Sequence, residues 1–274
     1  MSLPFFNEML KQGITALSHF LNLAVEQKQE TIRIARVGSA LLLAGCSARS
    51  TFPGKKVASY LTSTQQKDGG WHDTEETVWC LRYLDTFGYT FNRNMLYGRK
   101  WLKSIQLPCK AWGKDSRDMP RIPITALLAI LLPDIVDNES LYWLSKQWES
   151  ELDSPTQLTY KGAFFLLTQS HKDAPSKSDL VDRTISYLES EQEEDGGFAP
   201  WKGHPVGSDP WNTGVVLWGL SRVGKLAPRQ TIERALSWLK SNQLPNGLWP
   251  YHYLDDGTAM ALIGISSVLP IPTE

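Results

Sequence analysis

The hydrophobic pattern of the chain is dominated by six apolar segments that recur about every 45 residues. Each opens near a threonine and is apolar on almost every side, which is typical of a buried helix. The segments open near Thr31, Thr77, Thr125, Thr159, Thr213 and Thr258. A fixed spacing of this kind predicts a repeat architecture.

Amphipathic segments alternate with the apolar ones. Apolar residues fall at Ile232, Ala235, Leu236 and Leu239, the i, i+3, i+4, i+7 stripe of a half-buried helix. The expected amphipathic helices cover residues 5–28, 55–65, 95–106, 139–150, 178–192 and 229–242. This alternation predicts an inner barrel of apolar helices wrapped by outer amphipathic ones.

The two ends of the chain indicate how this double ring closes. The first helix is of the outer type and the last is of the inner type, so together they can complete one pair. An open solenoid is the alternative, but it usually needs polar capping repeats. We therefore predict an all-α, single-domain (α/α)6 toroid over residues 1–274, with its long loops 66–76, 107–124, 193–212 and 244–257 at one end, where function usually sits.

A short motif stands in the loops that precede four of the apolar segments. It reads Gln, three residues, Gly, one residue and an aromatic, as in Gln65, Gly69 and Trp71. Copies start at Gln192 and Gln243, and a weaker copy has Gln106, Lys110 in the glycine place, and Trp112.

Composition narrows the function classes. The 274-residue chain has a formal net charge of -1, which gives no electrostatic case for nucleic acid. Cys46, Cys80 and Cys109 form neither a metal spacing nor a disulfide framework, so we expect a cytoplasmic protein. No run reaches the roughly 20 apolar residues of a membrane span.

The Gln…Gly-x-Trp pattern resembles the QW repeats of the terpene cyclase and protein prenyltransferase β-subunit superfamily. The resemblance implies an α/α toroid around an apolar cavity, with chemistry at the N-termini of the inner helices and structural roles for the Gln and Trp. In prenyltransferases, zinc is held by an Asp-x-Cys pair and a later His. Here Asn212 stands in the place of the His, and no cysteine supplies the pair, so we expect no metal site.

The class II terpene cyclases, which use an Asp-x-Asp-Asp-Thr motif, are the closer resemblance. Asp73-Thr74-Glu75-Glu76-Thr77 aligns with it, which implies Glu75 as the proton donor between Asp73 and Glu76. Asp255 and Asp256 give a second candidate, with Asp256 in the donor register. Helix capping is the alternative interpretation, since Asp and Thr precede helices and Glu suits a first turn.

A cyclase also needs walls that stabilise a carbocation, and aromatic ring faces do so through their quadrupole. Packing in the core is the alternative role for such residues. The candidates for contact with substrate are Trp79, Trp201, Asp209, Trp211, Trp249, Tyr251 and Tyr253. His204 and His252 lie in the same loops and are candidates to take the final proton, although a lone loop histidine usually has no such role.

We therefore predict an isomerase- or lyase-type terpene cyclase of isoprenoid biosynthesis that acts on a short prenyl or polyprenyl chain. The alternatives are a non-catalytic prenyl- or lipid-binding toroid, a partner subunit, or an enzyme that uses the cavity for another cyclisation. No cofactor is expected, except magnesium if the substrate is a diphosphate. Basic loop residues that could then face the diphosphate are Lys110, Lys114, Arg117, Arg121 and Lys202. A solvated surface patch is the alternative interpretation of these residues.

Overall fold

The computed structural model describes residues 3–46, 52–90, 92–174 and 178–269. Within these ranges the regular structure is helical throughout. The inner helices are α2 (Thr31–Leu43), α4 (Thr74–Thr86), α6 (Ile122–Leu131), α8 (Thr159–Thr168), α10 (Pro210–Leu220) and α12 (Leu254–Val268). The outer helices are α1 (Leu3–Glu26), α3 (Gly54–Thr64), α5 (Arg93–Ser104), α7 (Asn138–Glu151), α9 (Ser178–Glu191) and α11 (Arg229–Ser241), and a short 3-10 turn, η2, spans Gly224–Leu226.

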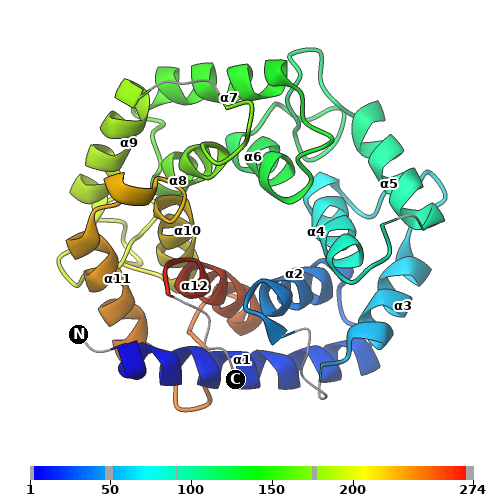
Figure 1. Ribbon diagram of the computed structural model, residues 1–274, viewed down its shortest axis with the longest axis horizontal. Helices are drawn as coiled ribbons and strands as arrows, with labels where there is room; N and C mark the ends of the chain where they lie inside the picture. Colours follow the sequence, from blue (N-terminus) through cyan, green and yellow to red (C-terminus); the bar gives the residue numbers. More distant parts are fainter. Residues whose placement is uncertain (1–2, 47–51, 91, 175–177, 270–274) are drawn as a thin grey trace.

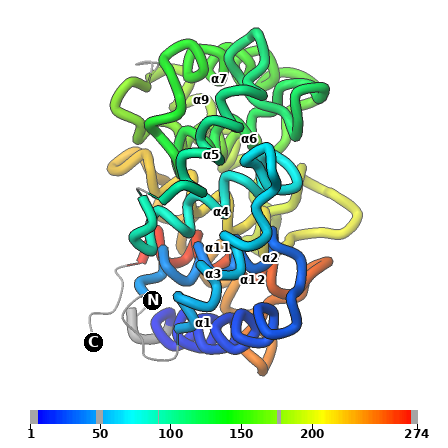
Figure 2. The backbone as a smooth tube through the Cα atoms, turned by 90° about the vertical axis from the view of Figure 1, so that its right-hand side faces the viewer, coloured from blue at the N-terminus to red at the C-terminus, as the bar shows by residue number. Residues whose placement is uncertain are grey.

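The even-numbered helices form a ring inside the odd-numbered ones, as Figure 1 shows. The ring closes because α12 packs against both α2 and α1. A hydrogen bond seals this junction, since Gln243 Nε2 donates to the Met9 carbonyl at 3.0 Å. The predicted (α/α)6 toroid is thus confirmed, and the side view in Figure 2 shows α1 running along the edge of the ring.

The repeated motif acts as a set of loop ties. Gln65 Nε2 donates to the carbonyls of Gly69 at 2.6 Å and Asn94 at 2.9 Å, which joins its loop to the start of α5. The Trp71 amide donates to Thr77 Oγ1 at 2.9 Å. Equivalent bonds to the hydroxyls of Thr125, Thr213 and Thr258 recur in the other copies.

These threonine bonds explain where the inner helices start. Because Thr77 reaches back to the loop from inside the first turn, α4 begins three residues before it, at Thr74. The starts of α6, α10 and α12 also precede their threonines, whereas α2 and α8 begin at the predicted Thr31 and Thr159. Lys110 adopts a φ of +68°, the left-handed conformation that Gly69 has at +103° in the equivalent place.

In the ranges described, no helix combines the length and apolarity that crossing a membrane requires.

Candidate functional site

The two candidate acids of the sequence are joined by one arginine. Arg36, in the second turn of α2, donates to Glu75 Oε1 on α4 at 2.7 Å and to Asp256 Oδ1 on α12. These helices are neighbours in the inner ring, and both acids stand in a first turn. The fold therefore gathers Glu75 and Asp256 into one network, which we call the Arg36 network.

The neighbouring Asp255 forms a second, closed ion pair. Arg33 Nε donates to Asp255 Oδ2 at 3.0 Å, and its Nη2 donates to the other carboxylate oxygen. Asp255 is only 2 % exposed. The guanidinium also lies 5.0 Å from the centre of the Tyr253 ring, which accounts for the placement of that exposed tyrosine. Asp255 thus fixes the first turn of α12 to α2 and is not a free acid.

Two other predicted acids cap inner helices. Asp73 accepts the Glu76 amide at 2.9 Å at the start of α4. Asp209 accepts the amide of Asn212 at 2.8 Å and its side-chain Nδ2 at 2.7 Å at the start of α10. Capping is thus the role that their geometry shows, as the alternative interpretation of the motif anticipated.

Burial is the largest influence on the pKa of three acids of the site. It raises the pKa of Asp256, which Arg36 opposes and the charge of Glu75 reinforces. Burial likewise raises the pKa of Asp209, against the hydrogen bonds from Asn212. It also raises the pKa of Glu76, against the hydrogen bond from the His72 backbone.

Tyr251 lies next to the starts of α10 and α12, because both its Cβ and Pro210 border Gly257. Its pKa is raised by burial first, and then by the charges of Asp209 and Asp256. The phenol therefore lies within electrostatic reach of both carboxylates, beside the starts of α10 and α12. Asp209, Tyr251, Asp256, Arg36 and Glu75 thus follow one another over four consecutive inner helices.

An aromatic cluster stands at the start of α10, where Trp211 follows the capping Asp209 by two residues. The Trp211 ring meets Tyr160 edge-on at a centroid distance of 5.9 Å and lies 6.3 Å from Phe164. Trp79 and Trp249 are fully buried instead. The Trp249 indole donates to the Leu239 carbonyl at 2.7 Å, so this side chain packs the core.

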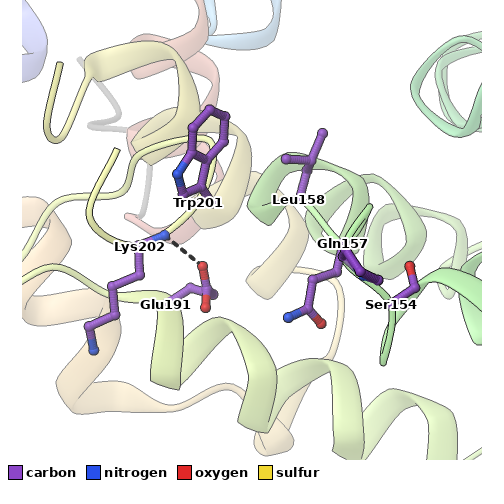
Figure 3. Close-up of a pocket in the computed structure, with 7 residues that line it drawn as sticks. Ser154, Gln157, Leu158, Glu191, Trp201 and Lys202 are labelled. Atoms are coloured by element: carbon purple, nitrogen blue, oxygen red, sulfur yellow. Dashed lines mark hydrogen bonds between the residues drawn. The ribbon is translucent and has the colours of Figure 1, made fainter. Parts of the chain in front are cut away.

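Trp201 instead lines a pocket with a volume of about 450 Å³, shown in Figure 3. Glu191, Lys202 and Leu158 are among the other lining residues, and the Lys202 amide donates to Glu191 Oε2 at 2.7 Å. No member of the Arg36 network lines this pocket. The structure therefore separates Trp201 from the acids.

The basic loop residues are largely engaged with protein groups. Arg121 Nε binds Asp118 Oδ2 at 2.7 Å. The other contacts are Arg117 with Asp115, Lys110 with Glu139, and Lys202 Nζ with the Ser190 carbonyl. Among the described residues, no group of three or more His, Cys, Asp and Glu side chains could hold a metal ion.

Arg33 and Arg36 are residues of the candidate site that the sequence analysis missed. Their position in the sequence could have revealed them, since two cations stand near the N-terminus of a buried helix. The helix dipole disfavours positive charge there. Such a placement indicates acidic partners from neighbouring helices, which Asp255, Asp256 and Glu75 supply.

Comparison with known proteins agrees with this architecture. Residues 147–259 match the family described as squalene-hopene cyclase C-terminal domain. Among curated proteins, no sequence matches the chain significantly.

Solved structures give a likeness over the whole ring. The type II terpene cyclase MstE from Scytonema, without ligand, superposes with a TM-score of 0.81 at 14% identity, covering 99% of this chain and 100% of that one. An MstE variant with geranylgeranyl dihydroxybenzoate gives 0.77 at 14% identity, with the same coverage. For ent-copalyl diphosphate synthase from Streptomyces platensis the TM-score is 0.63 at 16% identity, over 87% of this chain and 50% of that one. The chain therefore has the α/α toroid fold of the class II terpene cyclases.

Proposed function

We propose that the protein is a class II terpene cyclase, which protonates a carbon–carbon double bond of a short prenyl or polyprenyl chain and closes one or more rings. The observation that carries this proposal is the Arg36 network. Two carboxylates from separate repeats, both in the register of the proton donor, share one guanidinium, and the aromatic cluster of Trp211 and Tyr160 stands at the start of α10, which packs against α12.

Asp256 is the better placed of the two acids. The network holds two carboxylates and one guanidinium, so a single proton makes it neutral. Burial raises the pKa of Asp256, and its side chain is 19% exposed against 30% for Glu75. We therefore assign the transferable proton to Asp256, while Glu75 accepts a hydrogen bond from Arg36 and holds the guanidinium in place. The dipole of α12 opposes this by about 0.3–1 kcal/mol at an exposed terminus.

The reaction is balanced without a cofactor. Asp256 gives its proton to an alkene carbon, which forms a C–H bond and leaves a carbocation at the adjacent carbon. A second alkene attacks this cation, which closes a ring and moves the charge onward. Loss of a proton from carbon then restores a double bond. The aromatic faces of Trp211, Tyr160 and Phe164 suit the stabilisation of the cation.

The named neighbours support an isoprenoid as the substrate class. MstE was solved with geranylgeranyl dihydroxybenzoate as its substrate and with merosterolic acid A as its product. In that protein the prenyl chain is attached to an aromatic acid, so a diphosphate is not required. Either kind of prenyl compound is therefore a candidate here, and magnesium enters only with a diphosphate.

Product analysis tests the proposal. Purified protein is incubated with geranyl, farnesyl and geranylgeranyl diphosphates and with a geranylgeranylated hydroxybenzoate. Because a positioned acid contributes about 10²–10⁴-fold, Asp256→Asn is expected to abolish detectable product, and Glu75→Gln to slow its formation. Asp73→Asn is the control, since Asn caps a helix as well as Asp does, and it is expected to keep turnover.

One outcome of this product analysis would refute the cyclase proposal. If no compound is cyclised, while prenyl compounds bind the wild type, Glu75→Gln and Asp256→Asn equally, the protein is a binding toroid and not a cyclase. The closed ion pairs of the Arg36 network are the feature that favours this second function.

A further inference from the structure

Two unpaired arginines lie at the other end of the inner ring. Arg82 is in the last turns of α4, and Arg222 follows the end of α10 by two residues. These helices stand on opposite sides of the ring in Figure 1. In the part of the chain that the structure describes, neither side chain forms an ion pair or a hydrogen bond. Both nonetheless lie close enough for the charge of Arg222 to lower the pKa of Arg82.

The same face of α4 holds two buried donors that lack acceptors. Arg82 Nε and Trp79 Nε1 are both inaccessible to solvent, and neither has a partner in the described residues. They are three positions apart, so they share one face of the helix. A buried N–H group without an acceptor is costly. Burial also lowers the pKa of Arg82, with only Asp85 acting against it, whereas Arg222 is exposed to solvent and its pKa is lowered by partial burial.

A pocket of about 440 Å³ adjoins Arg222. Ser170, His171 and Lys172, at the end of α8, supply further polar groups, and Ala129 and Ile130 of α6 supply an apolar side. The pocket lies at the ends of α6 and α8, the two inner helices that stand between α4 and α10 in the ring, and of the two arginines only Arg222 lines it. The one acid in its lining, Asp134, is already paired with Arg99.

We propose that Arg82 and Arg222 bind the phosphate groups of a small phosphate ester, whose apolar part occupies this pocket. The planar guanidinium matches phosphate oxygens in a two-pronged fashion, and an anion would supply the missing acceptors. The sequence had offered the basic loops at the opposite end for such a group, but Arg117 and Arg121 are neutralised there by aspartates. The site goes beyond the proposed cyclisation and can be measured without turnover.

Calorimetric titration of the full chain tests the site. The probes are inorganic diphosphate, geranyl diphosphate and geraniol. Wild type is expected to bind both diphosphates saturably, with geranyl diphosphate tighter and geraniol weakest. Arg82→Gln and Arg222→Gln are each expected to weaken diphosphate binding by about tenfold or more, the usual loss when one member of a charged contact is removed. Arg121→Gln is the matched control, with an expected change below about twofold.

Several results would overturn the proposal. One is the lack of saturable diphosphate binding to wild type, and another is unchanged affinity in the two arginine variants. Loss of binding in Arg121→Gln alone would place the anion in the loops. The two arginines could instead only stabilise their helices, because cations near helix C-termini also complement the dipole. Thermal midpoints measured without ligand distinguish this role from anion binding. That role predicts lower midpoints with unchanged affinity. If a Gln variant does not fold, Arg222→Lys keeps the charge, and it must still weaken binding because it lacks the planar fork.

Discussion

Replacement of Arg36 by Met is the sharpest test of how the inner ring is held together. The substitution keeps an apolar stem in place but removes the only cation in the Arg36 network. Glu75 and Asp256 are then left facing each other at 30% and 19% exposure. The two carboxylates repel each other whenever both are ionised, and neither acid retains the hydrogen bond that it now accepts from Arg36.

The burial of the two acids determines the expected loss in the free energy of unfolding. Breaking a buried ion pair by removing one partner costs about 3–5 kcal/mol. The partial exposure of both acids places the value at the lower end, about 3 kcal/mol near pH 7. In a domain of this size, that loss lowers the thermal midpoint by roughly 6–12 °C.

The stability lost in Arg36→Met should change with pH in a definite direction. Arg36 lowers the pKa of Asp256, so its removal raises that pKa further above the unfolded value. A group with a raised pKa in the folded state binds its proton more tightly there than in the unfolded chain. Its contribution to stability is then lost as the pH rises through the folded pKa. The penalty of Arg36→Met should therefore be larger at about pH 8 than at about pH 5.

Urea unfolding followed by circular dichroism at both pH values measures the effect. Arg99→Met is the matched control, because its partner Asp134 is 59% exposed and such a pair contributes only about 0–1 kcal/mol. A further variant that combines Arg36→Met with Glu75→Gln and Asp256→Asn should recover most of the loss. If Arg36→Met costs no more than the control at either pH, or costs more at the lower pH, the reasoning fails.

Three further predictions concern the repeat ties. Lys110→Gly should raise the free energy of unfolding by about 0.5–1 kcal/mol, because glycine adopts the positive φ of this site without strain; a decrease in a urea titration would contradict this. Thr258→Val removes the acceptor of the buried Trp249 amide and should cost about 1–3 kcal/mol, whereas Thr258→Ser should cost distinctly less. Gln243→Ala cuts the bond to Met9, so amide exchange in α1 should accelerate well before exchange in α6, and uniform protection would argue against a seam at this junction.

The repeat pattern in the sequence was enough to predict most of the fold. A helix that is apolar all round has to be buried, and a helix with one apolar stripe has to cover it, so the alternation of the two kinds determines a double ring. Helix starts were less accurate, because Thr77 and its counterparts bind the preceding loop from within the first turn. The left-handed Lys110 was visible only as an irregular copy of the motif, since it took the place of a glycine.

The candidate site was predicted in part. Register within the repeats placed Glu75 and Asp256 at helix starts, and both are there. It could not show that one arginine bridges them, because Arg36 is 39 residues from Glu75 and 220 from Asp256 in sequence. Nor could spacing separate Trp211 from Trp201, since only packing decides which loop aromatic meets Tyr160 and which lines an outer pocket.

Deuterium incorporation from solvent tests the central claim most directly. The carboxyl proton of Asp256 exchanges with water, so an alkene protonated by this acid in D₂O acquires one deuterium from it. For a turned-over prenyl compound, we predict a cyclic product with one deuterium at the protonated carbon and its head group intact, and none of this product with Asp256→Asn. A cyclic product without deuterium, or one formed with release of diphosphate, would contradict protonation-initiated chemistry.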